Sequence, residues 1–191
     1  MQKHFIFGLF FFLGFFSKAQ ESKFSVYLLP QVGFNQTKIE DDKQYSFSSG
    51  IDVYTAYKLN TLNIETGLGY RHHQSDDLEI QTLHIPLGIN TVLNFTKNNE
   101  DSLQQPLFGL AIGLGIYASH LLEYETEILK EKNIGWNFGA YGRGGLMIVP
   151  KNAMKIGVGL QRFQDFSYIK ENNYKLKQTN NSVYLALGFD L

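Results

Sequence analysis

The sequence predicts an all-β fold, an eight-stranded antiparallel up-and-down transmembrane β-barrel. Large apolar residues recur at every second position in eight segments, which is the period of a β-strand with one apolar face. The residues between them are mostly small or polar, and these suit the narrow interior of an eight-stranded barrel. Beyond residue 19, no segment approaches the roughly 18 consecutive apolar residues that indicate a transmembrane helix.

The composition limits the class of protein. The chain has 191 residues, of which 18% are charged and 15% aromatic, and its formal net charge is -1. This balance gives no basic face for nucleic acid. The absence of cysteine excludes a disulfide framework and thiolate metal ligands. The mean hydropathy of -0.18 is too low for a helical membrane protein but suits a barrel, in which only alternate residues face lipid.

The N-terminus has the pattern of a secretory signal peptide. Lys3 provides a positive start, residues 5–16 are apolar, and Ser17 and Ala19 are the small residues of a cleavage site. The alternative is a membrane anchor, but the apolar run is shorter than the roughly 20 residues that span a bilayer. We therefore expect residues 1–19 to be a signal peptide and residues 20–191 to be the outer-membrane barrel domain.

Each alternating segment is expected to be close to the 9–11 residues of a tilted membrane strand. Their apolar positions fall within 24–34, 45–53, 62–70, 83–95, 108–116, 134–138, 154–160 and 183–191.

The links between these segments differ in length. Those after the second and sixth segments are short, whereas residues 36–44, 120–133 and 164–181 are longer or highly polar. Barrels of this class have short periplasmic turns and longer outer loops. We therefore expect both termini in the periplasm. The charged run 123–132 is expected to lie in an outer loop with one possible helical turn.

Aromatic residues are predicted to form two girdles at the membrane interfaces, where an apolar ring with a polar tip is favoured. The periplasmic girdle would contain Phe24, Tyr57, Phe95, Phe108 and Phe189. The outer girdle would contain Phe34, Tyr45, Tyr70 and Trp136.

Four residues interrupt the pattern. Pro30 and Pro86 lie within strands and remove ladder hydrogen bonds, so bulges are expected there. Gly142 and Gly144 fall on the lipid face of the sixth segment and predict a notch or a register slip. The register of residues 142–145 stays open at this point.

The run Leu83-His84-Ile85-Pro86-Leu87 resembles the "LxIPL" strand of the small outer-membrane β-barrel proteins of Bacteroidota, which are porin-like or OmpA-like. The Ala19-Gln20 junction is similar to signal cleavage sites in those bacteria. The last segment looks like an outer-membrane assembly signal, although it ends in Leu191 where Phe is usual. The resemblance implies an outer-membrane barrel of a Gram-negative bacterium that contacts lipopolysaccharide and the assembly machinery. It implies no particular activity.

Charged residues on the inward face are the first candidate site, because charges inside a barrel must pair or stay hydrated. The pattern allows either a structural ion-pair network or a gate on a narrow ion path, in which Glu65, Arg71 and Arg143 would be central. The full set comprises Asp52, Lys58, Glu65, Arg71, Arg143, Lys155 and Asp190.

Two other groups are weaker candidates. His72 and His73 with the nearby Asp76 and Asp77 resemble metal ligands, but adjacent strand residues point to opposite faces. For the same reason Ser119 and His120 cannot act as a nucleophile and its base. No catalytic residue, metal site or cofactor is therefore predicted.

We expect a monomeric, non-enzymatic barrel with a structural or surface-recognition role carried by its outer loops. One alternative is a narrow pore or gated transport through the charged lumen. A second alternative is a surface lipid hydrolase, which requires a nucleophile, a base and an oxyanion donor around one atom.

Overall fold

A computed structural model shows the fold. It describes residues 23–39, 42–95, 107–126, 130–149, 154–166, 169–171 and 174–191. The predicted signal peptide, residues 1–19, lies outside the described residues. Within the described part, no helix is long and apolar enough to cross a membrane.

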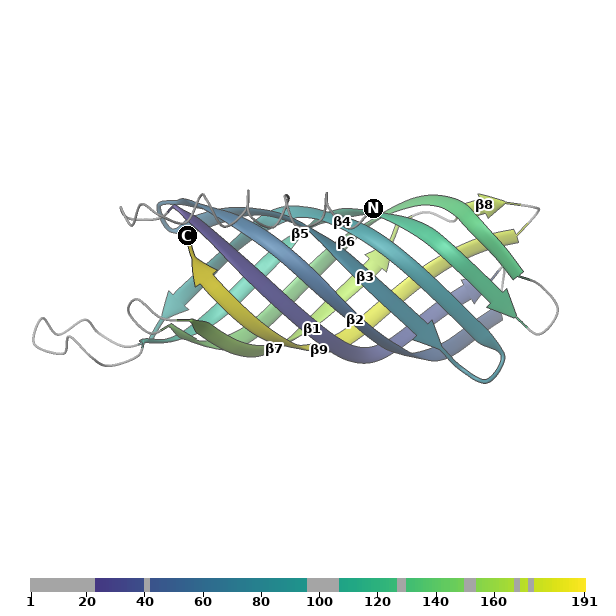
Figure 1. Cartoon of the computed structure of the whole chain (residues 1–191), viewed down its shortest axis with the longest axis horizontal. Coiled ribbons are helices and arrows are strands. Elements are labelled where there is room, and N and C mark those ends of the chain that lie inside the picture. Colours follow the sequence, from purple (N-terminus) through teal and green to yellow (C-terminus); the bar gives the residue numbers. More distant parts are fainter. Residues whose placement is uncertain are drawn as a thin grey trace, which may run out of the picture.

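Antiparallel strands form one closed sheet (Figure 1). Each strand pairs with its neighbour in sequence, β7 pairs with β9, and β9 pairs with β1. The ring therefore has eight strands, and the predicted fold class is confirmed. The three-residue β8 pairs with β9 at the end of the barrel opposite the C-terminus and adds no strand to the ring (Figure 1). The strands are β1 (Phe24–Ile39), β2 (Asp42–Leu59), β3 (Leu62–Gln74), β4 (Leu78–Asn94), β5 (Leu107–Thr126), β6 (Lys130–Val149), β7 (Lys155–Asp165), β8 (Ile169–Glu171) and β9 (Tyr174–Asp190).

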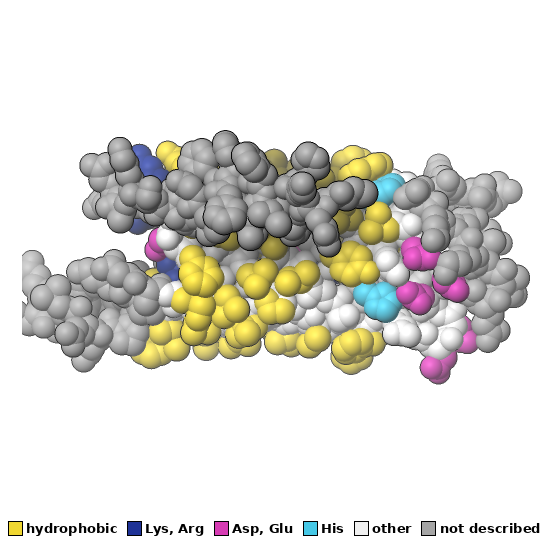
Figure 2. Space-filling view, in the orientation of Figure 1, with side chains coloured by type: hydrophobic (Ala, Val, Ile, Leu, Met, Phe, Trp, Pro, Cys, Tyr) yellow, Lys and Arg dark blue, Asp and Glu magenta, His cyan; other side chains and the backbone are white. Residues whose placement is uncertain are grey.

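The outer wall carries a continuous apolar band (Figure 2). Alternation of side chains across each strand exposes one set and buries the other. On β4, for example, Ile85, Leu87 and Ile89 are exposed, whereas His84 and Asn90 are buried. An apolar wall around a polar interior is the reverse of a soluble barrel and matches a strand that faces lipid.

The strands are longer than the sequence predicted. The eight ring strands have 11 to 20 residues, not 9–11. The predicted loops 36–44 and 120–133 consist largely of strand, since β1 continues to Ile39 and β5 to Thr126. The helical turn expected within 123–132 is wrong for residues 123–126 and 130–132, which are extended; residues 127–129 lie outside the described part.

Beyond the apolar band, the barrel continues as a region we call the polar extension. It comprises residues 36–39, 42–45, 72–74, 78–81, 121–126, 130–135 and 174–179. Its outward surface carries acidic residues such as Glu79, Glu123 and Glu125. Figure 2 shows acidic side chains gathered at one end of the molecule. The interior of the polar extension holds an apolar cluster formed by Leu78, Ile80, Leu121, Ile134 and Leu176, with Tyr124 packed against it.

The position of Ile134 differs from the one predicted. The sequence places it on the lipid face with Trp136, but it is 9% exposed and packs inside the polar extension. The register between β5 and β6 shifts between Leu121 and Glu123, and Gly135 adopts a φ of 142°, which favours glycine. This bulge reverses the side-chain phase of β6 and turns Ile134 inward.

The bulges do not lie at the prolines. Pro30 faces Ile51 and Pro86 faces Tyr117 in continuous registers, so the bulges predicted there are wrong. The bulges lie between Gln81 and Thr82 and opposite Leu121–Glu123. The register through residues 142–145 is also continuous. A register slip is therefore excluded, and the other prediction, a notch on the lipid face, remains.

Candidate functional site

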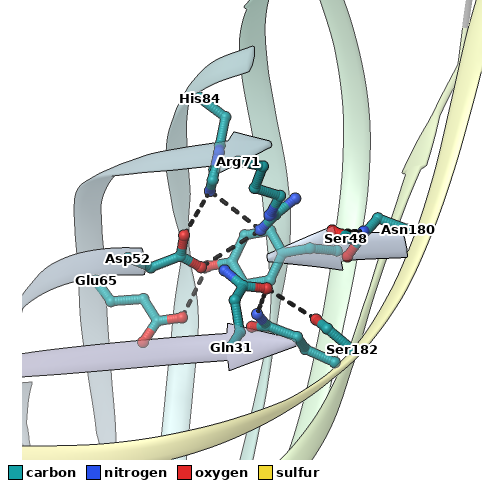
Figure 3. Close-up of polar contacts among 10 residues, drawn as sticks. Gln31, Ser48, Asp52, Glu65, Arg71, His84, Asn180 and Ser182 are labelled. Atoms are coloured by element: carbon teal, nitrogen blue, oxygen red, sulfur yellow. Dashed lines mark hydrogen bonds and ion pairs between the residues drawn. The ribbon is translucent and has the colours of Figure 1, made fainter. Parts of the chain in front are cut away.

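The first buried charge cluster joins β2, β3 and β4 inside the barrel. The carboxylate of Asp52 accepts a hydrogen bond from the Arg71 guanidinium at 3.3 Å and lies 3.0 Å from Nε2 of His84. The same guanidinium nitrogen of Arg71, Nη2, also lies 3.1 Å from that ring nitrogen. All three side chains are at most 5% exposed. Figure 3 shows them pointing toward one another from adjacent strands.

The second cluster lies around Glu65. Its carboxylate accepts hydrogen bonds from Arg143, from Asn90 and, at 2.7 Å, from the Tyr141 hydroxyl. Arg143 is on β6, far across the barrel from β3, so this contact bridges the lumen. A carboxylate held by three donors, one of which is a guanidinium, satisfies the requirement that buried charge be paired.

Aromatic rings cover both arginines. The Arg71 guanidinium carbon lies 3.6 Å from the centroid of the Phe163 ring, and that of Arg143 lies 4.4 Å from the Tyr54 ring. Phe163 also stacks on Tyr141, with ring centroids 5.2 Å apart. Cations favour the faces of aromatic rings, so these contacts lock the arginines and fill the lumen.

Glycines on the inward face make room for these groups. A Cβ on Gly69 would lie 2.0 Å from the His84 ring and 2.3 Å from an Asp52 oxygen. A Cβ on Gly113 would lie 2.9 Å from Nε of Arg143. The small inward residues of the sequence therefore leave room for the large side chains beside them.

Three of the predicted lumen charges lie apart from these clusters. Lys155 pairs with Asp190, but the aspartate side chain is 51% exposed, and Lys58 is exposed at the end of β2. Ser25 also donates a hydrogen bond to Asp190 at 2.5 Å. This group forms a rim at the barrel end that holds the C-terminus. The structure thus brings together Asp52 with Arg71 and Glu65 with Arg143 in the lumen, and Lys155 with Asp190 at the rim.

An uncharged cluster inside the barrel joins the neighbouring strands β1 and β9 to β7 and β2. Gln161 donates to Gln31, and the hydroxyl of Ser182 donates to the same Gln31 oxygen at 2.8 Å. Asn180 donates to Ser48 at 2.6 Å, and Figure 3 shows this contact beside the first charge cluster. These bonds tie the closing pair of strands to their neighbours.

Little space remains inside the barrel. Two lumen cavities lined by described residues have volumes of about 30 and 20 Å³, which is room for one or two water molecules. Arg143 and Tyr184 line the first, and Arg71 and Phe163 line the second. The two cavities share no lining residue, so side chains of the clusters separate them.

The histidines predicted as weak candidates are placed in different surroundings. His72 lies 3.1 Å from Glu79 on the outer wall, whereas His73 is buried inside. His120 stacks on Trp136 with ring centroids 4.9 Å apart, and its Nδ1 lies 3.0 Å from the carbonyl oxygen of Gly135. Within the described part of the chain, no serine hydroxyl is hydrogen-bonded to a histidine ring.

The predicted girdle residues lie on the outer wall, in two groups. Phe24 packs on Tyr57 with centroids 4.9 Å apart near the C-terminal end. At the other edge of the apolar band, Phe34 packs edge-on to Phe47 at 6.5 Å. Most of the predicted residues are more than one-third exposed: Phe24, Phe34, Tyr45, Tyr70, Phe95, Phe108, Trp136 and Phe189.

Sequence reasoning missed Phe163 and the Asp165–Tyr117 hydrogen bond of 2.6 Å. Both positions continue the inward phase of Gln161 on β7. The polar residues after Gln161 suggested a loop, although an alternating Arg162-Phe163-Gln164-Asp165 run was a signal for continued strand.

Comparisons with known proteins address the fold. No model of a protein family matches the sequence, and no curated protein matches it. Among solved structures, Neisserial surface protein A is similar over 88% of this chain and 98% of its own, with a TM-score of 0.54 and 13% identity. The N-terminal β-barrel domain of Pseudomonas aeruginosa OprF is similar over 89% of this chain and all of its own, with a TM-score of 0.51 and 10% identity.

The outer membrane enzyme PagL is also similar, over 82% of this chain and 97% of its own, but its TM-score of 0.41 carries no functional argument. At these identities the likeness concerns the fold alone. The family and the taxon suggested by the sequence stay predictions. This chain has the closed eight-stranded fold of small outer-membrane β-barrels.

Proposed function

We propose that this protein is an integral outer-membrane β-barrel with a closed lumen, both termini in the periplasm, and a structural or surface-recognition role carried by its polar extension. The observation that carries the proposal is the change of polarity along the wall. The apolar band requires lipid, because side chains such as Leu87 and Phe138 are more than half exposed on it.

The polar extension supports a role outside the membrane. Its charged outer surface and its interior cluster around Ile80 and Leu121 are those of a water-soluble structure. Strands that continue into water give the connecting segments a rigid base, and rigid elements position binding residues better than free loops.

The interior favours a closed barrel over a pore. Glu65 and Arg143 bridge the lumen, and the separated cavities hold only a few water molecules. Eight strands enclose an interior that side chains can fill. We expect no single-channel conductance from the purified barrel in planar bilayers, and steady conductance through the wild type would favour transport instead.

The described residues also favour a non-enzymatic role. Hydrolysis at a lipid surface requires a nucleophile beside its base. Here His84 contacts Asp52 and Arg71 inside the barrel, and His120 stacks on Trp136. Release of fatty acid from lipopolysaccharide by the purified protein, abolished by His120→Ala, would contradict this part of the proposal.

Single cysteines test the location and orientation, because the chain contains no cysteine. Asp76 lies in the exposed turn between β3 and β4, and Thr61 lies in the exposed turn between β2 and β3 at the opposite end. A membrane-impermeable maleimide should label Asp76→Cys on intact cells and should label Thr61→Cys only after the outer membrane is permeabilised.

The two variants serve as controls for each other. Labelling of Thr61→Cys but not of Asp76→Cys on intact cells would reverse the proposed orientation. Recovery of the protein in the periplasmic fraction, without a mobility shift on heating in gel electrophoresis, would contradict membrane insertion.

A further inference from the structure

The chain contains three arginines, and their environments differ. Arg71 and Arg143 pair with carboxylates inside the barrel. Arg162 is exposed on the outer wall of β7, where its guanidinium donates a hydrogen bond of 3.3 Å to the side-chain carbonyl of Gln164. Among the described residues no carboxylate pairs with it, so its charge is available for an anion.

Arg162 borders an apolar groove. On β6, Gly142 and Gly144 face outward, and a Cβ on either would meet nothing within 4 Å. The groove has a volume of about 600 Å³, within the range of about 300–1,000 Å³ typical of ligand sites. It extends over β6, β7, β9, β1 and β2, and its outward side chains are Val32, Phe34, Phe47, Leu160, Arg162, Asn181 and Val183.

The groove lies where the apolar rows of β7 and β9 end. On β7 the outward side chain changes from Leu160 to Arg162, and on β9 it changes from Val183 to Asn181. Asn181 is paired with Arg162 on one side and with Phe34 on the other. On β6, the strand paired with β7 at this level, apolar outward side chains continue to Phe138 and Trp136. The charge therefore lies at the end of the apolar rows of β7 and β9, beside apolar surface on β6.

A row of lysines lies on the same strands, farther into the polar extension. Lys38 of β1 is directly opposite Lys43 of β2 and Lys177 of β9. Lys38 is four residues beyond Phe34, about 13 Å along the strand at roughly 3.3 Å per residue.

We propose that Arg162, the lysine row and the apolar groove together bind a phosphorylated glycolipid, the lipid A portion of lipopolysaccharide. An acyl chain lies in the groove over Gly142 and Gly144. A phosphate contacts Arg162, whose planar guanidinium can bind two of its oxygens. Further anionic groups of the saccharide reach Lys38 and Lys43.

The spacing of the charges selects this ligand over a glycerophospholipid. A glycerophospholipid carries its phosphate at one depth, next to its acyl chains. Here cations occur at two depths, since Lys38 lies farther along the strands than the row of Arg162 and Phe34. A polyanionic saccharide extends over both depths. The assignment rests on the proposed orientation, which puts this edge of the band in the outer leaflet.

Native mass spectrometry of the barrel, extracted in mild detergent from a Gram-negative host, tests the proposal. We expect one retained lipid A molecule per wild-type barrel. The double variant Arg162→Ala/Lys43→Ala should lower its retention about tenfold or more, since a charge-assisted contact contributes about 1.5–3 kcal/mol. The matched control Lys23→Ala/Lys58→Ala removes two exposed lysines at the opposite end and should retain lipid A as the wild type does.

A second variant tests the groove without changing charge. Gly144→Leu places a side chain in open space on the lipid face and should displace the acyl chain, whereas Thr55→Leu enlarges an exposed outward residue of β2 outside the groove. Heat-modified mobility on gels verifies that every variant folds.

Three outcomes would overturn the proposal. The first is equal lipid A retention by the wild type, Arg162→Ala/Lys43→Ala and Gly144→Leu. The second is equal or better retention of added phosphatidylglycerol, which would assign the site to a glycerophospholipid. The third is a lipid-free dimer that Gly144→Leu dissociates, which would make the groove an interface between two copies. None of them bears on the orientation, because the cysteine labelling tests that separately.

Discussion

The apolar band and the polar extension are built from the same strands with opposite polarity. In the band, Leu87 faces outward and the charged Asp52 and Glu65 are buried. In the extension, Ile80 and Leu121 are buried, whereas Glu79 and Glu123 lie on the outer surface. Side chains alternate across the strands in both regions, apart from the bulges near Gln81, Leu121 and Gly135. It is therefore the solvent around the wall that decides which face is apolar.

The two regions are stabilised differently. In the extension, burying apolar side chains removes them from water, as in any soluble protein. In the band, the outward side chains remain in hydrocarbon, and the interior combines hydrogen bonds and ion pairs, such as Glu65 with Arg143, with packing of aromatic and aliphatic side chains such as Leu29 and Phe163. Matched substitutions in the two regions should therefore have unequal effects.

The largest difference is expected for the buried ion pair. Arg143→Ala leaves Glu65 buried without its cation and should lower the free energy of unfolding by about 3–5 kcal/mol. The control Lys155→Ala removes a cation whose partner Asp190 is half exposed, and it should cost less than about 1 kcal/mol. Urea unfolding in lipid vesicles measures both, and equal losses would contradict the structural role of the lumen pair.

Isoleucine truncation compares the two regions directly. Ile80 is fully buried in the extension, and Ile85, on the same strand, is 43% exposed on the band. Ile80→Ala should cost about 2–5 kcal/mol because it leaves a cavity. Ile85→Ala should cost less than half as much, since lipid chains can fill the space. The reverse order, again from urea unfolding in vesicles, would mean that the regions are wrongly assigned.

A charge placed on the outer wall should distinguish lipid from water. Leu87→Arg introduces a cation on the band and should destabilise the inserted barrel by about 2–4 kcal/mol. Gln81→Arg, on the outer wall of the extension, should change stability by no more than about 0.5 kcal/mol. Comparable unfolding midpoints for the two variants would argue against a membrane boundary between residues 81 and 87.

The smallest effect is expected at the notch. Gly142→Ala adds a methyl group where nothing lies within 4 Å, so stability should change by no more than about 0.5 kcal/mol. Gly69→Ala is the contrasting variant, because its Cβ would overlap the His84 ring. It should greatly reduce the folded fraction on heat-modifiability gels, and tolerance of this change would contradict the packing of the lumen.

The sequence predicted the fold because lipid imposes a single rule on every strand, with apolar residues outward at alternate positions. It underestimated the strands because that rule ends at the membrane. Past the interface, polar outward residues such as Gln36 and Lys38 resemble a loop when only apolar runs are counted. The inverted alternation around Leu78 and Ile80 was the signal for continued strand.

The site was predicted only in part. The alternation of side chains along each strand identified Asp52, Glu65, Arg71 and Arg143 as lumen residues. It does not specify which of these charges form ion pairs. The bridge from Glu65 to Arg143 spans residues 78 positions apart, so it depends on closure of the barrel. Ile134 was assigned to the wrong face because the bulge at Gly135 has no counterpart in the alternation of apolar residues.

The accessibility of outward side chains along β4 tests most directly whether the wall reverses its polarity at the membrane boundary. Spin labels on single cysteines at residues 79, 81, 85, 87 and 89 would report collision with oxygen, which partitions into lipid, and with a water-soluble nickel complex. We predict high nickel accessibility at residues 79 and 81, and high oxygen accessibility with low nickel accessibility at residues 85, 87 and 89. Equal nickel accessibility at Gln81 and Leu87 would contradict this prediction.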